Sequence, residues 1–181
     1  MRKIVAGLFV SVDGVVEAPE TWTGAYFTPE IGEMVGSLIA AGDTLLLGRR
    51  TYETFAQSFA DDASGNPMAA QMNAVRKVVV STSLERADWQ NTTLVRGDVV
   101  DAVRALKDED GTNINMSGSA TLAVSLLRDG LLDQLDLLVF PVVVGHGRRL
   151  FHDDGDSIDL ALLSSDSLDN GVMHVVYGPS A

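Results

Sequence analysis

The sequence predicts a single α/β domain over residues 1–181, with a mostly parallel central sheet, helices on both faces of that sheet and a C-terminal antiparallel hairpin. Short apolar runs, which are typical of buried strands, alternate with segments of helical period. This alternation produces parallel strands joined by crossover helices. Near the C-terminus Asn170-Gly171 separates two strand-like runs, which is a strong signal for an antiparallel hairpin.

The strands are predicted from apolar runs that are too short for helices. In chain order these runs are residues 4–10, 44–47, 77–80, 92–95, 113–116 and 135–144, the last interrupted at Pro141, followed by the hairpin strands 160–167 and 172–177. Because most of them are separated by helical segments, we expect them to pair in parallel, with only the terminal hairpin antiparallel.

The helices are predicted from apolar residues at helical spacing and from residues that favour helix ends. The predicted segments are 29–41, 52–59, a short piece that ends at Val75, 99–106 and a helix from Thr121 to Arg128. The first follows Thr28 as N-cap and Pro29 at the first helical position, and it ends at Gly42. Asp98 is the expected cap of the fourth helix.

The composition narrows the possible classes of function. The chain has no cysteine, which excludes disulfides, thiolate nucleophiles and cysteine metal sites. Its histidines, His146, His152 and His174, lack metal-binding spacing, so no metal is expected. A net charge of −12 disfavours nucleic acid as a partner. No apolar run reaches the roughly 18 residues of a membrane span, and Arg2 and Lys3 lead straight into a strand, so we expect a cytoplasmic protein without a membrane partner.

The stretch 43–53, Asp-Thr-Leu-Leu-Leu-Gly-Arg-Arg-Thr-Tyr-Glu, predicts an anion site. A strand that ends at Gly48 and turns into a helix leaves unpaired backbone N–H groups, which favour an anion. Arg49 and Arg50 favour phosphate, because a guanidinium group matches its oxygens. The same letters are also compatible with a surface turn whose arginines are solvated.

Hydroxyls, glycines and arginines follow most of the predicted parallel strands. These residues are Ser11 and Asp13, Gly48 to Thr51, Ser81 to Ser83, Arg96 and Gly97, and Ser117 to Ser119. In open α/β sheets ligands bind beyond the carboxyl ends of the strands, so these side chains are expected at one edge. Their chemistry predicts a site for a phosphate-rich cofactor.

These motifs carry a resemblance to a known superfamily. Gly48-Arg49-Arg50-Thr51-Tyr52-Glu53 resembles the cofactor-binding turn of dihydrofolate reductases, and Ser81-Thr82 and Ser117-Gly118-Ser119 resemble the other two cofactor loops of that fold. Ser11-Val12-Asp13-Gly14 and residues 141–151 are similar to the reductase domain of bacterial riboflavin biosynthesis enzymes. The resemblance implies a three-layer dihydrofolate-reductase-like fold, closest to stand-alone relatives of the C-terminal riboflavin reductase domain.

The resemblance also implies NADPH as the cofactor. Gly48, Arg49 and Thr51 would hold its pyrophosphate, and Ser81 and Thr82 with Arg50 would surround its 2′-phosphate. The nicotinamide side of the pyrophosphate would be cradled by the turn Ser117, Gly118, Ser119, Ala120 and Thr121. Val10 and Ser11 would border the nicotinamide ring, and Gly97 is expected at the same edge of the sheet. The cofactor would supply a hydride, while the protein orients the acceptor.

The acceptor side has candidate acids in two places. Asp13 lies in the first loop, and Glu30 and Glu33 lie on the first predicted helix, where folate reductases place an acid. A structural role is the alternative for two of them: Asp13 as a turn residue, and Glu30 as a partner of the helix dipole. The implied function is an NADPH-dependent reductase of a small nitrogen heterocycle that is pterin-like, ribosylaminopyrimidine-like or flavin-like. A non-catalytic nucleotide- or flavin-binding protein of the same fold is the alternative.

The apolar stretch 135–144 also suggests a homodimer formed through the late strands.

Overall fold

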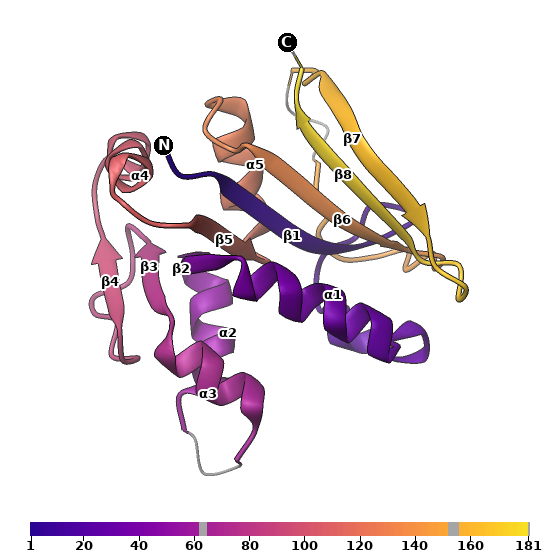
Figure 1. Ribbon diagram of the computed structural model, residues 1–181, viewed down its shortest axis with the longest axis horizontal. Coiled ribbons are helices and arrows are strands. Elements are labelled where there is room, and N and C mark those ends of the chain that lie inside the picture. Colours follow the sequence, from indigo (N-terminus) through magenta and orange to yellow (C-terminus); the bar gives the residue numbers. More distant parts are fainter. Residues whose placement is uncertain (62–64, 152–155, 181) are drawn as a thin grey trace.

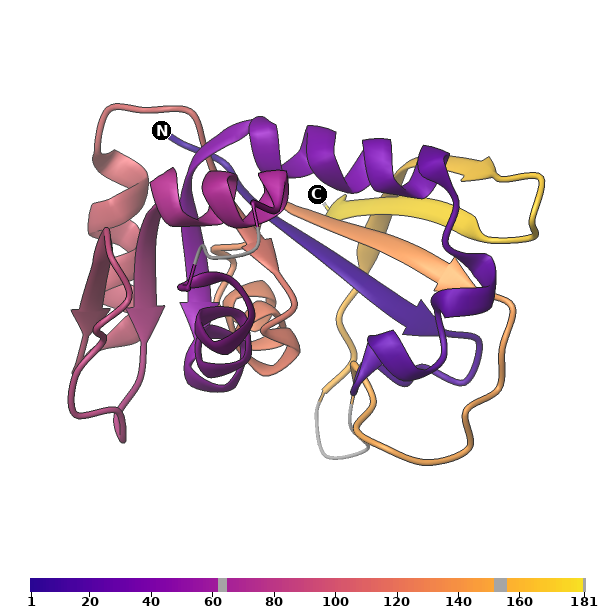
Figure 2. The ribbon, with the colours of Figure 1, turned by 90° about the horizontal axis from the view of Figure 1, so that it is seen from below.

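The fold is built on one eight-stranded sheet, seen in a computed structural model that describes residues 1–61, 65–151 and 156–180 (Figure 1). The predicted residue His152 lies outside the described residues. The strands are β1 (Ile4–Ser11), β2 (Gly42–Gly48), β3 (Arg76–Val80), β4 (Thr92–Val95), β5 (Asn113–Ser117), β6 (Gln134–Phe140), β7 (Leu160–Ser167) and β8 (Met173–Pro179). Their order across the sheet is β4-β3-β2-β5-β1-β6-β8-β7, with β4 and β7 at the two ends (Figure 2).

Strands β1 to β6 pair in parallel, and only β8 and β7 run antiparallel to their neighbours. The predicted mostly parallel sheet with a terminal hairpin is therefore confirmed. The hairpin turns at Gly171, whose φ of +85° is a conformation that glycine adopts without a steric penalty.

Helices cover both faces of the sheet. They are α1 (Pro29–Ala40), α2 (Arg49–Phe59), α3 (Pro67–Ala74), α4 (Val99–Asp108) and α5 (Ala120–Arg128), with single 3₁₀ turns at Pro19–Thr21 and Gly24–Tyr26. Apolar side chains of α4 and α5 pack on the face that carries Ile4, Ala6 and Leu8. On the opposite face, α1, α2 and α3 pack on the other side chains of the same strands (Figure 1). Two helical layers around one sheet make the three-layer architecture that the sequence predicts.

Two predicted boundaries differ from the structure, and both have a local cause. The strand predicted over 135–144 ends at Phe140, because Pro141 has no N–H to donate to a neighbouring strand. Beyond it the chain leaves the sheet, and Val143 is 72% exposed. Helix α2 begins at Arg49 rather than Tyr52, with Gly48 as its N-cap, so both arginines lie in the first helical turn.

The first part of the stretch that suggested a dimer lies inside the sheet. Strand β6 lies between β1 and β8, and its Leu135 and Phe140 are buried in the core of the same chain. The fold therefore explains the apolar character of residues 135–140, and a dimer stays a prediction.

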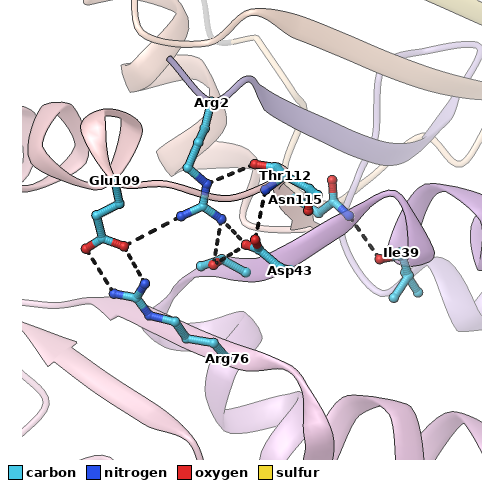
Figure 3. Close-up of polar contacts among 8 residues, drawn as sticks. Arg2, Ile39, Asp43, Arg76, Glu109, Thr112 and Asn115 are labelled. Carbon is cyan, nitrogen blue, oxygen red and sulfur yellow. Dashed lines mark hydrogen bonds and ion pairs between the residues drawn. The ribbon is translucent and has the colours of Figure 1, made fainter.

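A polar network fixes the amino-terminal ends of the strands, opposite the edge where the cofactor is expected (Figure 3). The buried Arg2 donates to the carbonyl of Thr112 at 2.9 Å and to the hydroxyl of Thr44 at 2.8 Å, and it pairs with the carboxylate of Asp43. Since these partners stand at the starts of β2 and β5, one guanidinium group holds the entries of three strands together.

A second buried cation lies under α3. Lys77 on β3 is fully buried, and its Nζ donates to the carbonyls of Met72 at 2.7 Å and Val75 at 2.8 Å. The same Nζ lies 4.4 Å from the ring centroid of Trp89. The lysine thus satisfies carbonyls at the end of a helix, where the chain itself offers no donor.

Candidate functional site

A cavity of about 1300 Å³ lies along the α1 and α2 side of the sheet. Its lining includes the start of α2, the turn between β5 and α5, the loop after β1 and the middle of β1, β6 and β8. Of the residues that the sequence predicts for the site, the cavity is lined by Gly48, Arg49, Arg50, Thr51, Ser117, Gly118, Ser119, Ala120 and Thr121. Two separate sequence motifs are therefore brought to one site.

The two motifs meet because β2 and β5 are neighbours in the sheet. Each strand runs into a helix, so the N-termini of α2 and α5 stand side by side at the same edge. Ser119 joins them: its hydroxyl accepts from the N–H of Gly48 at 3.0 Å, and its own N–H donates to the hydroxyl of Thr51 at 3.0 Å. The unpaired N–H groups of two helices thus gather beside one cavity, which favours an anion.

Gly118 has a strict geometric requirement for glycine. Its φ is +69°, and a Cβ built on it would lie 3.2 Å from the methyl group of Thr51. The backbone therefore has both a left-handed conformation and a close neighbour at the point where the two turns touch. Gly118 lines the cavity at this point of contact.

The two adjacent arginines differ in their surroundings. The guanidinium group of Arg49 donates to both carboxylate oxygens of Glu53, at 2.9 and 3.1 Å. Arg50 lines the cavity and is exposed, and it has no ion-pair partner among the described residues. Arg50 is therefore the more available cation for a phosphate group.

Several predicted cofactor residues do not line the cavity. The hydroxyl of Ser81 accepts from the N–H of Leu84 at 2.9 Å and holds a local turn, and Thr82 and Gly97 are exposed beside it. Val10 points to the α5 side of the sheet, and Ser11 is buried under the following loop. From β1 it is Gly7, Leu8 and Phe9 that line the cavity instead.

Asp13 holds two loops together. Its carboxylate accepts from the hydroxyl of Ser11 at 2.7 Å and from the N–H groups of Val144 at 3.0 Å and Gly145 at 2.8 Å. These hydrogen bonds, that from Ser11 most, lower the pKa of Asp13 to about 2. The carboxylate joins the loop after β1 to the segment after β6 and does not line the cavity. Its contacts favour a structural role over the predicted contact with an acceptor.

Replacing Asp13 by asparagine is expected to lower the thermal midpoint of unfolding at neutral pH, because an amide cannot accept all three hydrogen bonds as well as a carboxylate. The folded-state pKa of about 2 lies below the ordinary value of 3.8. The stabilising contribution is therefore complete above pH 3.8 and disappears as the pH falls through about 2. The thermal midpoints of wild type and variant, measured between pH 2 and 7, give the pH dependence of this contribution. A difference between the two midpoints that stays constant over that range would contradict the prediction.

The other predicted acid, Glu33, is exposed on α1 and does not line the cavity. The cavity side of this helix carries Met34, Val35 and Leu38 instead. Neither predicted acid thus lines the cavity.

The structure adds polar residues that the sequence patterns do not reveal. Asp136 on β6, His174 on β8 and Arg148 in the segment after β6 all line the cavity. The side-chain Nε of Arg148 is buried without a hydrogen-bond partner among the described residues. The backbone N–H of Arg148 donates to the carboxylate of Glu17 at 2.8 Å. Asp136 stands within an apolar strand, so only the sheet pairing shows which face it occupies.

Solved structures identify the class of the fold. A putative riboflavin biosynthesis protein from Shewanella sp. PV-4 matches all of both chains with a TM-score of 0.80 and 21% identity. Dihydrofolate reductase from Enterococcus faecalis, complexed with NADP(H), matches 99% of this chain and 97% of its own with a TM-score of 0.65 and 14% identity. The fold is dihydrofolate-reductase-like.

Sequence comparison identifies the family. The model of the RibD C-terminal domain family matches residues 2–174, and the chain belongs to that family. The uncharacterized protein YyaP of Bacillus subtilis is 26% identical over 182 residues, covering 97% of this chain and 94% of that protein. YwjB of the same organism is 28% identical over 155 residues, covering 84% of each. Family membership supports a reductase-type role.

None of the helices in the described part of the chain has the length and apolarity that crossing a membrane requires.

Proposed function

We propose that this protein is an NADPH-dependent reductase of a small nitrogen heterocycle of the pterin, ribosylaminopyrimidine or flavin type. The observation that carries the proposal is the meeting of two helix N-termini at Ser119, beside a glycine whose Cβ position is filled by Thr51. Such a cradle suits a pyrophosphate, because the N–H groups and the helix dipoles all favour negative charge.

The size of the cavity supports two ligands. Pockets for one small ligand commonly hold about 300–1000 Å³, whereas this cavity holds about 1300 Å³. One end is polar and carries the phosphate cradle. The other end lies between α1 and strands β6 and β8, with Met34, Leu38 and Leu138 as apolar walls. A nicotinamide lying between the two ends would face an acceptor in the second.

Different residues would bind the cofactor and orient the acceptor. The N–H groups in the first turns of α2 and α5, together with the hydroxyls of Ser119 and Thr51, would hold the pyrophosphate. Gly48 and Gly118 would let the two turns approach each other, and Arg50 would add positive charge. The bound NADPH supplies the hydride, and the apolar walls exclude water from the acceptor and keep its ring flat against the cofactor. The protein thus contributes binding and orientation rather than a covalent intermediate.

Two measurements test the proposal. The first is the titration of NADPH, NADH and FMN into the protein. The second follows the loss of NADPH absorbance in the presence of dihydrofolate, a ribosylaminopyrimidine or oxidised flavin. We expect NADPH to bind most tightly and at least one heterocycle to be reduced. Failure to bind either nicotinamide nucleotide would contradict it.

We expect NADPH to bind more tightly than NADH by about 1.5–3 kcal/mol, which corresponds to roughly 10- to 150-fold, because a charge-assisted contact to the 2′-phosphate is lost in NADH. Ser81, Thr82 and Arg50 motivate this prediction, and Arg50 is the one of them that lines the cavity. The Arg50→Gln variant should therefore lose most of the preference. Arg104→Gln, which removes an exposed guanidinium group that does not line the cavity, is the matched control and should leave the preference unchanged. Equal affinities in the wild type would contradict the prediction.

A nucleotide- or flavin-binding protein without catalysis is the second candidate. It is favoured by the positions of Asp13 and Glu33, neither of which lines the cavity. Tight NADPH binding without turnover of any heterocycle in the panel would favour this candidate.

A homodimer and a cytoplasmic location stay predictions. Because β6 is internal, a contact through the late strands would have to use the edge strand β7, where Leu162 and Leu163 are 57% and 58% exposed. Light scattering at micromolar concentration is expected to give the mass of two chains, and the mass of one chain would contradict the dimer.

A further inference from the structure

Asp136 and His174 form a pair on the floor of the acceptor end of the cavity. In the sheet, Asp136 on β6 lies opposite Gly7 of β1, and His174 on β8 lies opposite Leu138 of β6. All of these residues point to the α1 side, and the His174 Nε2 contacts the carboxylate of Asp136. A Cβ built on Gly7 would lie 2.3 Å from Leu38, so Leu38 of α1 packs directly on Gly7, and both Leu38 and Asp136 line the cavity.

The pair has hydrogen-bonding capacity left over. The side chains of Asp136 and His174 are only 14% and 20% exposed, and both residues line the cavity. The second oxygen of Asp136 accepts one bond, from the amide of Gln134 at 3.2 Å, although a carboxylate offers about four lone-pair positions. The Nδ1 of His174 has no partner among the described residues. A carboxylate oxygen that can accept a hydrogen bond and an imidazole nitrogen therefore lie next to each other in a mostly apolar pocket.

The surroundings restrict what can use these groups. Met34, Leu38, Phe9 and Leu138 enclose the same end of the cavity, so a ligand there must be largely apolar on its faces and polar on one edge. A ligand that covers this carboxylate must itself donate a hydrogen bond to it, because the free lone pairs then lose their contact with water. A flat ring that brings its own N–H to the pair satisfies both conditions.

From this geometry we infer that Asp136 and His174 bind the lactam edge of the heterocycle, a ring N–H beside a ring carbonyl. The ring N–H donates to Asp136, and the ring carbonyl accepts from the Nδ1–H of His174 in its imidazolium form, whose Nε2–H is already donated to Asp136. The inference rests on the proposed function for its class of ligand, and it assigns to Asp136 the acceptor contact that the sequence suggests for Asp13 or Glu33. Pyrimidinediones, pterins and flavins all carry this edge.

The experiment measures binding directly and does not need turnover. Diaminouracil, which carries lactam edges, is titrated into the full chain with and without saturating NADP⁺. Its N,N′-dimethyl analogue, which lacks the ring N–H groups, is the matched ligand. Long-range proton–nitrogen NMR spectra of the imidazoles report on His174, since the chain has three histidines and His174→Gln assigns the signal.

We expect diaminouracil to shift the His174 signal and the dimethyl analogue to bind at least about tenfold more weakly. Asp136→Asn should weaken diaminouracil binding by a similar factor and leave the NADPH dissociation constant within about twofold. Asp166→Asn is the matched control, because Asp166 is cross-strand to His174 but does not line the cavity. It should leave both affinities unchanged.

The outcomes separate this inference from the proposed function. If NADPH binds and a heterocycle is reduced but His174 does not respond to diaminouracil, the inference is overturned while the reductase function stands. If NADPH does not bind but His174 responds to diaminouracil alone, the proposed function fails and the pair is still a ligand site. Equal binding of diaminouracil and its dimethyl analogue overturns the inference even where the Asp136→Asn variant does not fold.

Discussion

Replacing Gly118 by valine is expected to abolish measurable NADPH binding and to leave a folded protein. At a φ of +69° a β-branched residue is strained, by about 1–3 kcal/mol. The new Cβ would lie 3.2 Å from the Thr51 methyl and 3.4 Å from its hydroxyl, which holds the N–H of Ser119. The change therefore separates the two turns that form the cradle. Because several contacts to the pyrophosphate are lost together, we expect a loss of at least about 100-fold in affinity.

The Gly130→Val variant is the matched control for this experiment. Gly130 has a φ of +67°, and a Cβ built on it would meet no atom within 4 Å. It thus carries the same backbone strain at the far end of α5 without touching the cradle. Isothermal titration of NADPH into both variants, with thermal unfolding alongside, distinguishes strain from binding. A Gly118→Val protein that binds NADPH as the wild type does would place the cofactor elsewhere.

Replacing Lys77 by methionine is expected to destabilise the protein by about 2–4 kcal/mol at neutral pH, although methionine is apolar and similar in length. The carbonyls of Met72 and Val75 lose their donor inside the core, and each buried unsatisfied group costs about 1–3 kcal/mol. The contact with Trp89 is lost as well. Chemical denaturation measures the difference, and an equal or higher stability of the variant would contradict the prediction.

The stability difference between wild type and Lys77→Met should also depend on pH. Burial lowers the pKa of Lys77 to about 8, from an ordinary value of 10.5. Between these values the unfolded state binds more protons than the folded state, so the wild type gains stability as the pH rises from about 8 to 10.5. The gain is at most about 3 kcal/mol, from the conversion of about 1.36 kcal/mol per pKa unit. Because the variant lacks this group, the difference should widen over that range, and a constant difference would contradict the assigned pKa.

The fold could be predicted largely from local patterns. Each expected element depends on residues that are close in sequence. Examples are the Asn170-Gly171 turn, the caps at Thr28 and Asp98, and the short apolar runs. The meeting of the two strand-end motifs at Gly48 and Gly118 could also be predicted, because such motifs lie together when their strands are neighbours in a parallel sheet.

The acceptor end could not be predicted in the same way. Asp13 resembles a site residue because it follows a central strand, but the loop geometry turns its carboxylate toward the N–H groups of Val144 and Gly145. Asp136 is one polar residue in an apolar strand, and His174 is 38 residues further along the chain. No local pattern relates these two residues. Only the pairing of β6 with β8 places them on one face beside a cavity.

The position of β1 in the sheet has a consequence for how the chain folds. This strand is synthesised before β5 and β6, yet these two strands are its neighbours in the sheet, so that Ile4 pairs with Ile114. At synthesis rates of about 5–20 residues per second, its partners emerge roughly 5–20 s later. During that delay an apolar strand of eight residues has both edges unpaired, which is the typical template for aggregation. We therefore expect slow refolding, governed by closure of this long loop, and a refolding yield that falls as the protein concentration rises.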